Sequence, residues 1–155
     1  MTEVARGLTG RPLPVQVQPA PVAPARQYSD DPLLVVHAPL PEQQVESSVQ
    51  TLTVRGIALD RNAPPNTGVG GSGVSRVVAY LDGGKRDGTF VGEATLGKTS
   101  RDATGWGERF GTAGWEMQIH PTELGEDPHA LFIYATSAVS DNETLVIAPF
   151  RIVSR

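Results

Sequence analysis

The sequence of 155 residues contains no cysteine, which excludes disulfide bonds, thiolate metal sites and cysteine nucleophiles. Aromatic residues make up only 6% of the chain, so an aromatic-lined substrate cleft is not expected. The formal net charge is −4 and no basic run is present, which argues against nucleic acid or an anionic membrane surface as a partner. No apolar run approaches the ~20 residues of a membrane-spanning helix, so membrane insertion is not expected.

The beginning of the chain also lacks a positive stretch followed by the about 7 to 15 apolar residues of a secretory signal. Residues 1–12 have the sequence MTEVARGLTGRP, in which no apolar run forms. We therefore expect no conventional export signal here: either a leader has been removed, or the protein is made in a cytoplasm and reaches its place by assembly.

Proline is abundant in the first part of the chain, where ten of the thirteen prolines lie within 65 residues. Residues 11–31 have the sequence RPLPVQVQPAPVAPARQYSDD, which excludes a helix or an interior strand. We predict that residues 1–32 form an extended arm in front of a single domain, residues 33–155. A simple spacer would not need apolar side chains, so we expect five of them to contact a partner: Leu13, Val15, Val17, Val22 and Tyr28.

After the arm, apolar and polar residues alternate with period two between separators rich in Gly, Pro, Asn and Asp, which is typical of β-strands. The pattern predicts strands at Leu33 to His37, Gln50 to Leu59, Val74 to Leu81, Thr89 to Leu96, Trp115 to His120, His129 to Ser137 and Leu145 to Val153. About seven short strands at this spacing predict an all-β fold, an immunoglobulin-like β-sandwich.

The same alternation predicts which side chains face the core. The expected core residues are Leu52, Val54, Val77, Ala79, Leu81, Trp115, Met117, Ile119, Leu131, Ile133 and Ala135. Three aromatic residues, Tyr80, Phe132 and Tyr134, occupy the opposite face of their strands. We expect them to cover a subunit contact, although single exposed aromatic residues are ordinary on protein surfaces.

Two long segments between the strands are predicted to be surface loops, residues 60–73 and 98–114. The first contains two prolines and several glycines, and the second contains Trp106 and Phe110. Loops of this length are uncommon unless they bind or pack onto something. We include Trp106 and Phe110 among the candidate partner-binding residues, with capping of one end of the sandwich as the other interpretation of Trp106.

One segment matches a catalytic motif, since residues 92–99, GEATLGKT, fit the phosphate-loop pattern G-x-x-x-x-G-K-[ST]. A phosphate loop must join a buried strand to a helix whose N-terminus faces the phosphates. Residues 93–96 instead alternate like a strand, and residues 100–107 have no helical periodicity. We therefore expect no nucleotide binding.

The remaining polar residues form no pattern that indicates catalysis or metal binding. The three histidines, His37, His120 and His129, lie far apart at predicted strand ends. The acidic turns at residues 82–87 and 141–143 lack the spacing of a calcium loop. We therefore expect no enzymatic activity, no catalytic residue, no cofactor and no metal.

The segments VRGIALD (54–60), GVSRVVAYLDG (73–83), GTFVGEATLGKTSRD (88–102), GWEMQI (114–119) and HALFIYATS (129–137) resemble bacterial immunoglobulin-like modules of surface and secreted proteins. The resemblance covers about two thirds of the chain. It implies a β-sandwich, but it does not specify the function, because such modules serve as spacers, adhesins, carbohydrate-associated domains and parts of virions.

A single module cannot act as a stalk, and here it follows an apolar arm. Our first hypothesis is therefore a non-enzymatic virion protein, a decoration or auxiliary protein on the surface of a phage capsid. It would assemble through its arm with other copies of itself and with a major capsid or other lattice protein. The alternative is an extracellular or cell-surface module for adhesion or carbohydrate binding that uses the loops around Trp106 and Phe110.

Overall fold

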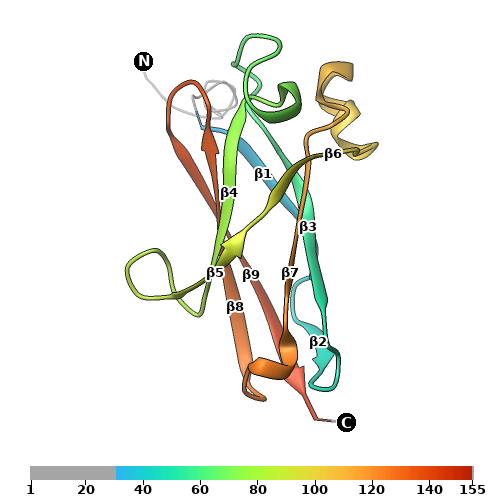
Figure 1. Cartoon of the computed structure of the whole chain (residues 1–155), viewed down its shortest axis with the longest axis vertical. Helices are drawn as coiled ribbons and strands as arrows, with labels where there is room; N and C mark the ends of the chain where they lie inside the picture. Colours follow the sequence, from blue (N-terminus) through green and yellow to red (C-terminus); the bar gives the residue numbers. More distant parts are fainter. Residues whose placement is uncertain (1–30, 155) are drawn as a thin grey trace, which may run out of the picture.

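The computed structural model describes residues 31–154 and confirms an all-β, immunoglobulin-like sandwich of two sheets (Figure 1). One sheet contains four strands in the order β1 (Leu33–Ala38), β3 (Leu52–Leu59), β7 (Gly114–Ile119) and β6 (Thr95–Lys98). The other contains five strands in the order β2 (Gln43–Glu46), β9 (Glu143–Val153), β8 (Pro128–Ser137), β4 (Val74–Leu81) and β5 (Thr89–Glu93). The expected contacts of Leu13, Val15, Val17, Val22 and Tyr28 lie outside the described residues.

Adjacent strands are antiparallel except for the parallel pair β2 and β9. Short 3₁₀ segments occur in the connections: η2 (Val69–Gly71), η3 (Asp102–Trp106), η4 (Glu108–Phe110) and η5 (Pro121–Glu123). Within residues 31–154, no helix has the length and apolar character needed to cross a membrane.

The predicted core is confirmed. Period-two alternation places Val77 and Ala79 of β4 and Leu131 and Ile133 of β8 between the sheets, each fully buried. Leu52 and Leu81 are only half-buried and pack at the margin of this core. The other expected core residues are also buried: Val54, Trp115, Met117, Ile119 and Ala135.

The predicted strand from Thr89 to Leu96 is wrong as a single element, because the chain changes sheets within it. β5 pairs with β4 in one sheet, and β6 pairs with β7 in the other. The crossing lies at the buried residue Ala94, whose N–H donates to the carbonyl of Val77 at 2.8 Å. With the short strand β2, this change of sheet raises the total from about seven strands to the nine of the two described sheets. The phosphate-loop match is thereby divided between two strands.

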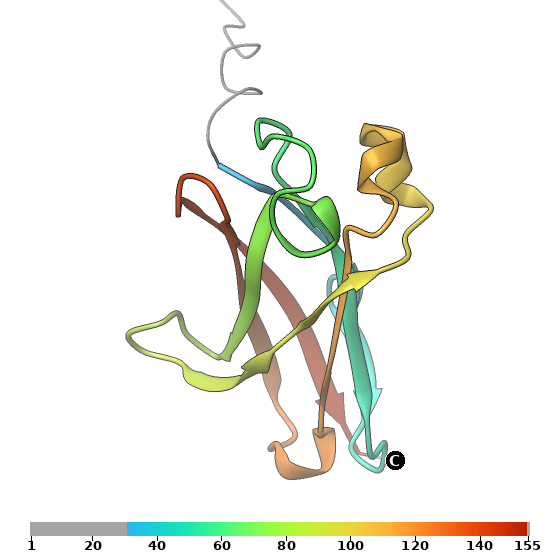
Figure 2. The ribbon, with the colours of Figure 1, turned by 45° about the horizontal axis from the view of Figure 1, so that its top comes forward.

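The loop of residues 98–114 packs on the outer face of the four-stranded sheet. Phe110 of this loop is 2% exposed and forms a second apolar cluster with Ile57 and Leu59 of β3. These two residues alternate with Val54 and Ala58, which belong to the main core. One end of this outer face is therefore covered by the chain itself, as the 3₁₀ segments of the loop show in Figure 2.

The loop of residues 60–73 lies at the same end of the sandwich (Figure 2), and polar contacts hold it there. The hydroxyl of Ser137 donates to the carboxylate of Asp60 at 2.6 Å, and both residues are buried. The guanidinium of Arg109 donates to the carbonyls of Ala63 and Arg61 at 2.8 and 3.0 Å. These bonds join the two long loops and the β8–β9 turn into one packed unit.

Candidate interaction site

The outer face of the five-stranded sheet carries a row of large apolar side chains across four strands. Strand register places Tyr80 of β4 opposite Phe132 of β8 and Phe90 of β5, and it places Phe132 opposite Ile147 of β9. Directly paired residues project to the same face of a sheet. Because the residues adjacent to Tyr80 and Phe132 in sequence include the buried Ala79, Leu131 and Ile133, this row points away from the core.

A second row lies beside the first, where Tyr134 of β8 is opposite Val78 of β4 and Leu145 of β9. Tyr80 makes edge-to-face ring contacts with Phe90 in its own row and with Tyr134 in the second row. The centroid of Tyr80 lies 5.5 Å from that of Phe90 and 5.9 Å from that of Tyr134. We call the two rows together the apolar face, which consists of Val78, Tyr80, Phe90, Phe132, Tyr134, Leu145 and Ile147.

Much of the apolar face is accessible to solvent within the described chain. Phe90 is 55% exposed, Ile147 is 50% exposed and Leu145 is 44% exposed, while Tyr80, Phe132 and Tyr134 are half-buried. Single exposed apolar residues are normal, but contiguous apolar patches mark contact surfaces. The continuity of the rows, rather than any one residue, therefore makes this face a candidate site.

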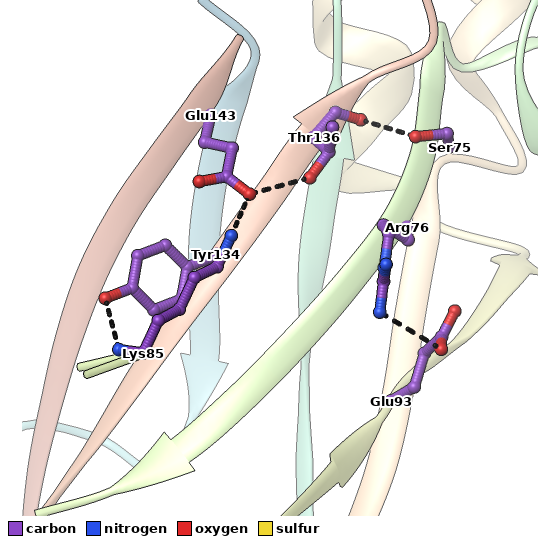
Figure 3. A network of polar contacts seen from close by, with 7 residues as sticks. All are labelled: Ser75, Arg76, Lys85, Glu93, Tyr134, Thr136 and Glu143. Atoms are coloured by element: carbon purple, nitrogen blue, oxygen red, sulfur yellow. Dashed lines mark hydrogen bonds and ion pairs between the residues drawn. The ribbon is translucent and has the colours of Figure 1, made fainter. Parts of the chain in front are cut away.

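A shallow hollow of about 340 Å³ adjoins the apolar rows, and its lining residues are Ser75, Arg76, Val78, Tyr80, Lys85, Thr136, Asp141 and Glu143. Arg76 lies 3.6 Å from Glu93, and the ammonium of Lys85 contacts the carboxylate of Glu143 (Figure 3). The two cations and their two acidic partners compensate each other. The hollow is thus polar but carries little net charge.

The ring of Tyr134 is held in place by the turn that follows β4. The backbone N–H of Lys85 donates to the Tyr134 hydroxyl at 3.2 Å (Figure 3), and the Lys85 ammonium lies 4.8 Å from the ring centroid. A Cβ atom on Gly84 would lie only 2.5 Å from the Tyr134 hydroxyl oxygen, so this close approach requires glycine. The apolar face therefore presents at least one ring in a fixed orientation.

His129 lies outside the apolar face, and its ring contacts hold the start of β8 in place. Its Nδ1 and Nε2 atoms lie 2.8 Å from the Asp82 carboxylate and from the Gly125 carbonyl. Burial would lower the pKa of His129, but the Gly125 carbonyl, the Asp82 carboxylate and the charge of Asp127 outweigh it and raise the pKa above the ordinary value of 6.5. Both oxygens accept a hydrogen bond from a ring N–H group, so they favour the imidazolium form.

The structure brings three of the predicted partner-binding residues together, since Tyr80, Phe132 and Tyr134 all belong to the apolar face. It adds four that the sequence interpretation missed, namely Val78, Phe90, Leu145 and Ile147. One signal for the last two was present: residues 145–148, LVIA, are apolar at both alternating sets of positions. A strand of this kind has apolar residues on both of its faces.

The two predicted partner-binding residues of the loop 98–114, Trp106 and Phe110, differ in burial. Phe110 is buried in the second apolar cluster, so the expectation that its ring meets a partner is corrected: the ring covers the protein's own sheet. Trp106 is 44% exposed, with the guanidinium carbon of Arg61 at 5.3 Å from its ring centroid. Within residues 31–154, no three His, Asp or Glu side chains group as a metal site.

No protein-family model matches the chain, and no curated protein matches its sequence. The structure is similar to that of the fibronectin(III)-like modules of CbhA from Clostridium thermocellum, with a TM-score of 0.51 and 15% identity. The alignment covers 92% of this chain and 54% of the other, so this chain spans about half the length of that protein. At this identity the similarity shows the fold alone, an immunoglobulin-like sandwich.

A second similar structure is the endo-β-1,4-mannanase from Thermotoga petrophila, with a TM-score of 0.49 and 12% identity over 82% of this chain and 20% of the enzyme. A third is dimeric latent PorU from Porphyromonas gingivalis, with a TM-score of 0.48 and 15% identity over 90% of this chain and 12% of the other.

Proposed function

We propose that this protein is a non-enzymatic assembly module that joins copies of itself through the apolar face. The observation that carries the proposal is the uninterrupted row of Ile147, Phe132, Tyr80 and Phe90 across four strands. Removing such side chains from water stabilises a complex by roughly 25 cal/mol per Å² of apolar area. A partner that covers this face therefore gains a substantial driving force.

The contrast between the two sheets supports the proposal. The outer face of the four-stranded sheet is covered at one end by Phe110 and its loop. Beyond that loop it carries polar residues such as Arg55 and Gln118, which are exposed. The outer face of the five-stranded sheet instead leaves three large side chains, Phe90, Leu145 and Ile147, exposed, although the turn after β4 contacts Tyr134.

The more specific form of the proposal is an auxiliary protein on a virion surface, where the module contacts a capsid or other lattice protein. Support for this form comes from the sequence, in which residues 11–31, rich in proline and apolar side chains, precede the sandwich. An arm of this composition suits a protein that links neighbouring subunits of a lattice.

The proposal is tested with Ile147→Lys in the full chain, measured by sedimentation velocity. Ile147 is half exposed, so a lysine at this position can keep its charge in water in a monomer, but a subunit contact would bury that charge unpaired. We expect wild-type protein to sediment as species larger than the 16.4 kDa chain and the variant to lose at least about tenfold in association constant, ~1.4 kcal/mol.

The matched control is Gln118→Lys, on the exposed outer face of the four-stranded sheet. This variant introduces the same charge and should assemble like the wild type. The proposal is wrong if wild-type protein stays monomeric at about 100 μM, a concentration at which even weak specific contacts are populated. Equal losses in both variants would also contradict it.

Carbohydrate binding at the loop end has less support. This alternative predicts an exposed aromatic platform at Trp106 and Phe110, but Phe110 is buried and one side of Trp106 faces the guanidinium of Arg61. Glycan binding that disappears in Trp106→Ala would restore this alternative.

A further inference from the structure

We infer that the apolar face of one copy binds the proline-rich segment of residues 12–25 from a neighbouring copy. This inference rests on the proposed function and names the part of the partner that occupies the face. It is carried by the chemistry of the two surfaces, by the place where the arm joins the domain, and by the lengths involved.

The chemistry of the segment fits the face. Residues 12–25 have the sequence PLPVQVQPAPVAPA, with five prolines and no charged residue. Such a segment favours the polyproline II conformation, which costs little entropy to dock. Protein surfaces that recognise these segments are lined by aromatic rings, between which prolines and small apolar side chains pack.

The apolar face supplies rings in the required arrangement. The ring planes of Tyr80 and Phe90 are inclined by 66°, and those of Tyr80 and Tyr134 by 90°, so the surface is ridged rather than flat. The hollow of about 340 Å³ beside Tyr80 offers space for a proline or valine side chain. Tyr134 is already fixed by the Lys85 backbone, which lowers the cost of ordering the site.

The charges are compatible as well. The uncharged segment would lie over the apolar rows, while Arg11 and Arg26 bound it at its two ends. The hollow and its margin carry Glu93 and Glu143 on strands at opposite sides of the face. Each carboxylate can accept from a second cation, so the flanking arginines have acceptors there.

The arm joins the domain close to the apolar face of its own copy, but on the other side of β9. Thr144 donates a hydrogen bond from its hydroxyl to the carbonyl of Pro32. The side chain of Thr144 alternates with that of Leu145, so Pro32 lies on the core side of β9 and is itself buried. The arm therefore starts between the sheets and not on the outer surface.

The lengths allow one copy to reach the next. Crossing the face from β9 to β5 takes three strand spacings, ~14 Å at about 4.8 Å each. Fourteen residues in a polyproline II conformation span ~43 Å at about 3.1 Å each, and the six residues 26–31 add ~19 Å. The segment is thus longer than one crossing, and the connecting residues leave room to bridge two subunits.

The test is paramagnetic broadening between copies of the full chain. Since the chain has no cysteine, a single Val17→Cys variant takes one nitroxide label and is mixed with ¹⁵N-labelled protein that carries no label. We expect loss of amide signal at Tyr80, Phe132 and Ile147 and unchanged signals at Arg55 and Gln118. Reduction of the nitroxide should restore the lost signals, and Ile147→Lys in the ¹⁵N-labelled copy should prevent the loss.

The outcomes separate the two proposals. If the protein assembles in an Ile147-dependent way but the label broadens no amide of the apolar face, the body of the partner covers the face, and only this inference fails. If broadening occurs only when the label and ¹⁵N are in the same chain, residues 12–25 bind the apolar face of their own copy. The inferred binding to a neighbouring copy is then wrong. If the protein does not assemble, the proposed function fails with the inference.

Discussion

Replacing Ser137 by alanine should destabilise the domain by ~2 to 4 kcal/mol, because one buried hydroxyl serves three polar groups. It donates to the Asp60 carboxylate at 2.6 Å, and it accepts from the backbone N–H groups of Val139 and Ser140 at 3.1 and 3.2 Å. Each buried polar group that loses its partner costs ~1 to 3 kcal/mol. Ser137 is fully buried and Asp60 is 2% exposed, so water can replace little of this bonding.

The assay is equilibrium unfolding in urea, followed by tryptophan fluorescence, with Ser75→Ala as the matched control. Ser75 is exposed and its hydroxyl makes one long bond, 3.3 Å to the Thr136 carbonyl, so its loss should change the free energy of unfolding by less than about 0.5 kcal/mol. An equal and small effect of the two substitutions would refute the view that the Asp60–Ser137 bond holds the loop end together.

Two further substitutions test the packing and the charge placement. Gly56→Ala should cost ~3 kcal/mol or more in urea unfolding, because its Cβ would lie 1.9 Å from the carbonyl oxygen of Val35; a normal midpoint would show that β1 and β3 lie farther apart. The raised pKa of His129 contributes stability that is complete below the unfolded value of about 6.5 and is lost as pH rises through the folded pKa. Asp82→Asn, which keeps the acceptor for the Ala130 N–H, should therefore flatten the fall in unfolding free energy above about pH 6.5, and an unchanged pH slope would contradict this account.

Sequence alternation was sufficient to locate β4, whose predicted bounds Val74 to Leu81 agree with the structure. It also placed Tyr80, Phe132 and Tyr134 on the outer face. The face assignment needs only the period of a strand, since every second side chain points the same way. This local rule holds wherever one strand has one buried and one exposed face.

Features that depend on strand partners were not accessible from the sequence. Alternation continues through residues 89–96, so nothing local marks the change of sheet at Ala94. Phe90 and Ile147 join the candidate site only because β5 and β9 flank the central strands in a particular register. Phe110 is buried because its loop packs against Ile57 and Leu59 of β3, which is distant in sequence. The loop sequence has no hydrophobic periodicity that would indicate this contact.

The pairing of β1 with β3 has a mechanical consequence. β1 begins at Leu33 at one end of the sandwich, and β9 ends at Val153 at the other (Figure 1). Tension applied to the chain before Leu33 and after Val153 therefore pulls β1 lengthwise along β3. Hydrogen bonds of an antiparallel pair lie across the strands, so this load shears them together rather than opening them one after another. A subunit that a neighbour holds by the segment before Leu33 would therefore resist unfolding when the two subunits are pulled apart.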